Sequence, residues 1–67
     1  MVQYFYVLFN KEMSAFYLED PNGFILYSED LLRAEHYHTE QEAKNILKYF
    51  KKPENWTVKK VTMSIDL

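Results

Sequence analysis

The start of the chain has the residue pattern of a β-strand. Residues 2–9 are mostly β-branched or aromatic and contain no Gly or Pro. One alternate set is Phe5, Val7 and Phe9, and the other is Tyr4, Tyr6 and Leu8. Because both sets are apolar, this strand is either central and covered on both faces, or has one face reserved for a partner.

A β-hairpin is predicted to follow. Residues 15–19 and 24–27 are two short apolar runs, and the sequence Asp20-Pro21-Asn22-Gly23 separates them. Pro presets φ at the second turn position, and Gly accepts a positive φ at the exit of the turn. We therefore expect two antiparallel strands joined by a tight turn.

A helix is predicted to begin at Thr39, which opens the capping box Thr39-Glu40-Gln41-Glu42. Apolar residues then follow at helical spacing, so that one stripe faces the sheet: Ala43, Ile46, Leu47 and Phe50. Pro53 prevents the helix from continuing.

Two segments are left with alternative interpretations. Residues 31–38 form either a helical turn or an extended segment against the core. In the final strand, residues 56–65, the apolar positions are even at Trp56 and Val58 but odd from Val61 onward. A bulge near Lys59 and Lys60 would bring both sets to one face. Otherwise the two ends of this strand serve opposite faces of the sheet.

These elements predict one α+β domain spanning residues 1–67, in the order strand, strand, strand, helix, strand. We expect a three- to four-stranded, mainly antiparallel sheet with one helix on one face. The chain has no cysteine and is 18% aromatic, so burial of bulky rings rather than disulfide bonds must stabilise the fold. No apolar run is long enough to span a membrane, and the N-terminus lacks the features of a signal peptide, so we expect a cytoplasmic protein.

The tyrosines are the first candidate functional residues. If Phe5, Val7 and Phe9 face the helix, four tyrosines share the uncovered face of the sheet and form a protein-interaction face: Tyr4, Tyr6, Tyr17 and Tyr27. We expect this face, or an exposed edge strand, to form a homodimer or to bind another protein. The alternatives are that the two faces are reversed, or that residues 28–38 cover this side.

The charges are unevenly distributed along a chain whose net charge is −2. Residues 1–42 carry eight acidic and two basic residues, whereas residues 43–67 carry six lysines and two acidic residues. The lysines are a candidate single-stranded nucleic-acid contact: Lys44, Lys48, Lys51, Lys52, Lys59 and Lys60. In a related alternative, acidic residues including Glu29, Asp30 and Glu35 imitate nucleic acid and block a DNA-binding protein.

Signatures of enzymes and of metal sites are weak. His36, His38 and Glu40 could in principle hold zinc, but polar residues leading into a helix explain them better. The chain has neither a cysteine nucleophile nor a glycine-rich loop. We therefore expect a non-enzymatic module with no metal, cofactor or small-molecule substrate.

The second half of the chain carries a resemblance on two short patterns: Ala34-x-x-Tyr37-x-Thr39-x-x-Glu42-Ala43 and Trp56-x-Val58-x-Lys60-Val61. In these residues it resembles small proteins of bacteriophages and prophages. The resemblance implies an accessory or regulatory role through protein contacts, as in phage-encoded inhibitors of host enzymes. It supplies no functional residue.

Overall fold

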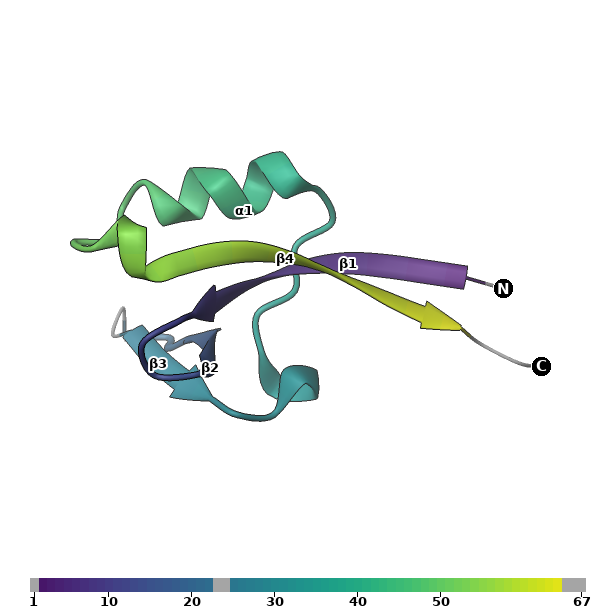
Figure 1. The fold of residues 1–67 in the computed structure, drawn as a ribbon, viewed down its shortest axis with the longest axis horizontal. Helices are drawn as coiled ribbons and strands as arrows, with labels where there is room; N and C mark the ends of the chain where they lie inside the picture. The colour runs from purple at the N-terminus through teal and green to yellow at the C-terminus, as the bar shows by residue number, and fades with distance from the viewer. Residues whose placement is uncertain (1, 23–24, 65–67) are drawn as a thin grey trace.

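The computed structural model describes residues 2–22 and 25–64 (Figure 1). Its elements, in chain order, are β1 (Val2–Asn10), β2 (Ala15–Glu19), β3 (Ile25–Ser28), the 3-10 helix η1 (Leu31–Arg33), α1 (Glu40–Leu47), the 3-10 helix η2 (Pro53–Asn55) and β4 (Trp56–Ser64). The predicted hairpin is confirmed, although Gly23 and Phe24 lie outside the described residues. Ile65, the predicted end of the last strand, also lies outside them.

Within the described residues, the four strands form one antiparallel sheet in the order β3-β2-β1-β4. Helix α1 packs against β1 and β4, which confirms the α+β class. β1 and β4 pair without interruption from Val2 opposite Ser64 to Asn10 opposite Trp56. Near the two termini this pair extends away from the rest of the molecule as a two-stranded ribbon (Figure 1).

The regular register of β4 decides between the two interpretations of its sequence. Because no residue is inserted between the paired positions, the bulge near Lys59 and Lys60 is wrong. Val58 packs on the core under the helix, whereas Val61 lies opposite Phe5 on the other face. The two ends of β4 therefore serve opposite faces of the sheet.

Residues 34–38 fill a gap between β1 and β2, which pair only at Phe9 with Phe16 and at Asn10 with Ala15. Beyond these pairs, Tyr37 exchanges two backbone hydrogen bonds of 2.8 Å with Tyr6. The Glu35 N–H donates to the Tyr17 carbonyl at 2.9 Å. Both alternatives for residues 31–38 thus occur in sequence, first a helical turn at η1 and then an extended segment.

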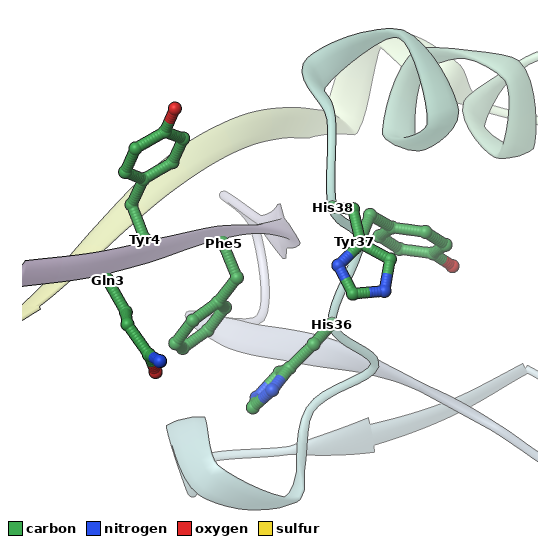
Figure 2. A pocket seen from close by; sticks show the side chains of 6 residues that line it. All are labelled: Gln3, Tyr4, Phe5, His36, Tyr37 and His38. Atoms are coloured by element: carbon green, nitrogen blue, oxygen red, sulfur yellow. The ribbon is translucent and has the colours of Figure 1, made fainter.

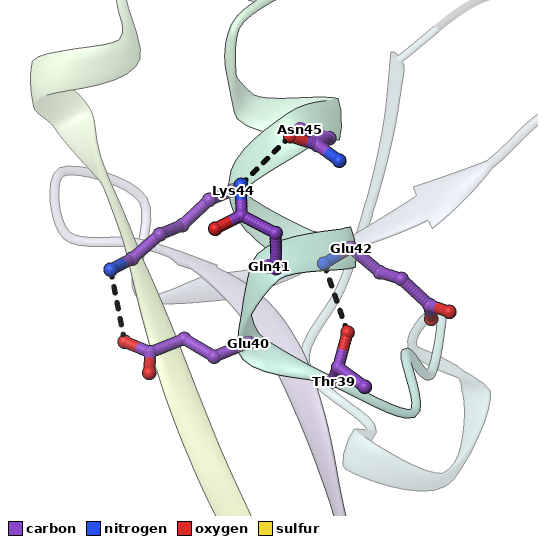
Figure 3. A network of polar contacts seen from close by, with 6 residues as sticks. All are labelled: Thr39, Glu40, Gln41, Glu42, Lys44 and Asn45. Carbon is purple, nitrogen blue, oxygen red and sulfur yellow. Dashed lines mark hydrogen bonds and ion pairs between the residues drawn. The ribbon is translucent and has the colours of Figure 1, made fainter.

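Helix α1 begins as its sequence predicts (Figure 3). Thr39 Oγ1 accepts the Glu42 N–H at 3.1 Å, and the Glu42 carboxylate accepts the His38 N–H, one residue before the cap. The last regular helical residue is Leu47, so Phe50 lies in the turn that follows. Phe50 still joins the core with Leu8, Tyr17, Ala43 and Trp56. Ala43 is fully buried, and its small side chain lets the helix approach the sheet closely.

Replacing Thr39 with Ala removes the hydroxyl acceptor at the start of α1. We expect Thr39→Ala to lower the free energy of unfolding by about 1 kcal/mol, because the Glu42 N–H loses its partner. Urea unfolding followed by circular dichroism measures this change. Gln41→Ala on the exposed side of the same helix is the matched control and should change the free energy of unfolding by less than about 0.5 kcal/mol. Equal effects of the two substitutions would contradict the capping role.

Candidate interaction sites

The predicted tyrosine face lies on the opposite side of the sheet from the one expected. Tyr17 is only 8% exposed, and its ring contacts those of Phe50 and Trp56 at centroid distances of 5.1 and 6.1 Å. Tyr6 packs against the same core. The prediction that these tyrosines share the face opposite the helix is therefore wrong, and the reversed assignment is correct.

The physical reason for this correction is that alternation shows which residues share a face but not which face a helix covers. Both alternate sets of β1 are apolar, so either could face the helix. Of the four tyrosines, Tyr4 and Tyr27 keep substantial exposure, at 56% and 44%. Tyr17 packs in the hydrophobic core, and Tyr6 packs against it.

The face opposite the helix is covered in part by the chain that follows η1 (Figure 2). The His36 ring stacks on Phe5 with a centroid distance of 3.9 Å, and His36 Nε2 lies 3.2 Å from the Leu31 carbonyl. A shallow pocket of about 420 Å³ lies beside this stack, between the start of β1 and residues 36–38. Among the described residues, no three side chains of the types that bind metals come together.

Tyr37 lies partly buried between this segment and the core. Its hydroxyl is buried without a hydrogen-bond partner among the described residues. Burial raises the pKa of the Tyr37 hydroxyl strongly, and the neighbouring Tyr17 and Glu35 raise it further. The pKa of Tyr17 is also raised, first by burial and then by the charges of Glu19 and Glu35. The environment thus favours the neutral form of both tyrosines.

The six lysines do not form one patch. Lys44 makes a 3.2 Å ion pair with Glu40 (Figure 3). Lys59 and Lys60 are neighbours on β4 and point to opposite faces, with their ammonium groups 4.7 and 4.2 Å from the centroids of the Phe9 and Tyr4 rings. Lys48 lies near Asn45 on the exposed side of α1, at 3.4 Å.

The remaining two lysines line a groove at the end of α1, here called the aromatic groove. Lys51 and Lys52 contribute to it together with Tyr27 and Trp56, and its volume is about 510 Å³. This groove combines residues from four separate parts of the sequence, so no local pattern indicates it.

The free edge of β4 is the other feature of interest. The Tyr6 N–H and carbonyl face Tyr37 and therefore point away from β4. Since backbone groups alternate along an antiparallel strand, the N–H and carbonyl groups of Val58, Lys60 and Thr62 point away from β1, toward the free edge. Among the described residues, no strand pairs with this edge. The sequence analysis predicted that an exposed edge strand could contact a partner protein, but it did not indicate which strand.

Comparisons with known proteins give no indication of function, so a function can be inferred only from the geometry of the structure. No family model matches the chain, and no curated protein and no solved structure matches it. Within the described part of the chain, no helix is long and apolar enough to cross a membrane.

Replacing Tyr37 with Phe removes its unpartnered buried hydroxyl and keeps the ring. We expect Tyr37→Phe to raise the free energy of unfolding by about 1 kcal/mol, because a buried polar group without a hydrogen bond costs stability. Urea unfolding at neutral pH measures the change. Tyr49→Phe is the control, since Tyr49 is 86% exposed and its hydroxyl is solvated. A loss of stability in Tyr37→Phe would show that the hydroxyl has a partner in solution.

The raised pKa values also predict a loss of stability at alkaline pH. Tyr17 and Tyr37 resist ionisation in the folded chain, whereas in the unfolded chain they ionise near the ordinary value of 10.0. The unfolded state therefore binds fewer protons above this pH, and the free energy of unfolding falls as the pH rises past 10. Urea unfolding between neutral pH and pH values above 10 measures this fall. The fall should be smaller in Tyr37→Phe, and an identical pH dependence would contradict the assignment.

Proposed function

We propose that this chain is a non-enzymatic protein-interaction module that binds an extended, acidic segment of a partner protein along the free edge of β4. The observation that carries the proposal is that β4, nine residues long, pairs with β1 alone among the described strands. An extended segment that adds to such an edge gains affinity from backbone hydrogen bonds and specificity from alternate side chains. A contact role of this kind is also what the resemblance to phage-encoded proteins implies.

The backbone geometry suits strand addition. Val58, Lys60 and Thr62 direct their N–H and carbonyl groups to the same edge, and every second residue of a strand repeats at about 6.6 Å. A partner strand can therefore bond to each of these residues in turn. Because the ribbon of β1 and β4 extends away from the rest of the molecule, this edge is accessible (Figure 1).

The lysines of β4 favour an acidic partner. Lys59 and Lys60 lie at the middle of the strand, one on each face, and each ammonium group lies over an aromatic ring. Lysines on an edge strand discourage pairing with a neutral or basic strand. A partner with two consecutive carboxylates places one on each face, and each cross-strand ion pair contributes about 0.2–1 kcal/mol.

The same charges disfavour a second copy of this chain as the occupant. Two-fold antiparallel pairing over the full length of β4 is centred on Lys60, so the Lys60 residues of the two copies would lie directly opposite each other. Like charges in directly opposite positions destabilise a sheet pair. A homodimer through β4 is therefore the less favoured alternative.

Nucleic-acid binding is also less favoured, because the lysines are dispersed over both faces of the sheet and the helix. Of the acids considered as an imitation of nucleic acid, Asp30 caps η1 through its carboxylate and Glu35 lies half-buried beside Tyr17. The Asp30 carboxylate therefore serves the local structure, and partial burial limits how much of Glu35 a partner could reach.

Proline at position 62 should block the docking of a strand without breaking the sheet. Thr62→Pro removes an N–H that faces the free edge, and proline is tolerated at such positions of edge strands. The probe is the blocked peptide Thr-Val-Thr-Glu-Glu-Val-Thr-Val-Thr, and the readout is amide hydrogen exchange by NMR. We expect the peptide to slow exchange at Val58, Lys60 and Thr62 in the natural chain, and to bind Thr62→Pro at least about fivefold more weakly.

Thr62→Val is the matched control, because it keeps the N–H and should bind the peptide as the natural chain does. Lys60→Glu provides a second variant and should also weaken binding, independently of any effect of proline on folding. Unchanged exchange with the acidic peptide, or equal protection by a peptide with Lys in place of Glu, would contradict the proposal. Protection at the β4 edge without peptide, together with a dimeric mass by light scattering, would favour self-association instead.

A further inference from the structure

The aromatic groove lies where the turn after β1, the end of α1, η2 and β3 come together, at the end of the sheet away from the ribbon (Figure 1). Its volume of about 510 Å³ is within the range of protein pockets that hold one small ligand or one anchoring side chain. Three features of its lining are independent of the β4 edge: a buried amide, a wall of packed rings and a pair of lysines.

The buried amide belongs to Asn10, which lines the groove and is only 5% exposed. Asn10 Oδ1 accepts the backbone N–H groups of Glu12 and Met13 at 3.0 and 2.9 Å, which fixes the orientation of the amide. With Oδ1 used in this way, the Nδ2 group is the hydrogen-bond donor that Asn10 can offer to a ligand.

The wall of the groove is rigid and apolar. Tyr27 stacks on Trp56 with a centroid distance of 5.7 Å and an interplanar angle of 13°, and the Phe50 ring lies 4.8 Å from that of Trp56. Met13 and Tyr49 line the groove and are exposed by 52% and 86%. Exposed apolar side chains gathered beside a cavity are typical of a surface that binds another molecule.

The charge of the groove favours an anionic ligand. Lys51 and Lys52 line it, and the backbone of Lys11 is held next to it by a 2.8 Å hydrogen bond to the Asn55 carbonyl. The Glu12 carboxylate also lines the groove but accepts a hydrogen bond from Asn55 Nδ2 at 3.2 Å. Because the lining holds two lysines and one carboxylate, its net charge is positive and favours a carboxylate of a ligand.

We propose that the aromatic groove is a second contact site that anchors a large apolar or aromatic side chain of an acidic peptide segment. The side chain packs beside Met13, Tyr27 and Tyr49, a backbone carbonyl of the segment accepts from Asn10 Nδ2, and adjacent carboxylates lie near Lys51 and Lys52. A peptide fits better than nucleic acid, because the Trp56 ring is already covered by its aromatic neighbours and is only 7% exposed to a base.

Trp56 is the only tryptophan of the chain and lines the groove, so its fluorescence reports binding directly. The probe is the blocked peptide Asp-Glu-Phe-Glu-Asp. We expect a saturable change in Trp56 emission that is lost when the Phe of the peptide is replaced by Ala. The double variant Lys51→Gln/Lys52→Gln should bind the peptide about fivefold more weakly.

The matched control is Lys59→Gln/Lys60→Gln, which removes the same charge from β4 and should leave this affinity within about twofold of the natural chain. Because this control impairs the β4 edge, it also separates failure of the groove from failure of the proposed function. Asn10→Asp keeps the acceptor for Glu12 and Met13, removes the donor and should weaken binding. Tyr49→Ala tests the rim independently if the buried carboxylate of Asn10→Asp prevents folding.

Several results would overturn the proposal. One is unchanged Trp56 emission at about 1 mM peptide, a concentration that reveals even weak binding. Another is equal weakening by the two double lysine variants, which would indicate a general charge effect. An equal response to a peptide with Lys in place of its acids, or to oligothymidylate, would also exclude an acidic peptide as the preferred ligand.

Discussion

The pair of backbone hydrogen bonds between Tyr6 and Tyr37 is the constraint on which the arrangement of this molecule depends. β1 and β2 pair at only two positions and then separate, so their facing backbone groups would be left unpaired inside the protein. Tyr37 and Glu35 satisfy groups on both strands. The same segment leads directly into the cap at Thr39, so it also sets where α1 begins relative to the sheet.

This insertion satisfies the side of β1 that faces away from β4, and the sheet order leaves β3 and β4 as its two outer strands. Tyr37 occupies the side of β1 that faces away from β4. α1 covers part of one face of the sheet, and the segment after η1 covers part of the other. Of the two outer strands, β4 is the longer, so it offers the longer free edge for backbone hydrogen bonds. The aromatic groove results from a different necessity. Asn10 holds the turn after β1 with its side-chain oxygen, and the same residue lines a cavity bounded by the core rings.

Local signals predicted the elements because their causes are local. Thr39 and Glu42 are three residues apart and act within one turn of helix, and the position of the hairpin follows from the turn residues between its strands. In β4 the apolar residues change from even to odd positions, which is compatible either with a bulge or with a regular strand whose two ends face opposite sides of the sheet. The structure has the regular strand. The sequence likewise identified Lys51 and Lys52 as candidates, but as members of a larger patch that the fold divides.

By itself, the sequence determined the α+β class, the order of the strands and the helix, and the residues of β1 and β2 that share each face, because periodicity and capping act over a few residues. Tertiary structure alone decided that Tyr17 is core and Phe5 faces away from the helix, since two apolar faces of similar composition have no local preference for a helix. It also brought Asn10, Tyr27 and Lys51 around one groove. Contacts between residues so distant in sequence depend on how whole elements pack, and no short pattern records that packing.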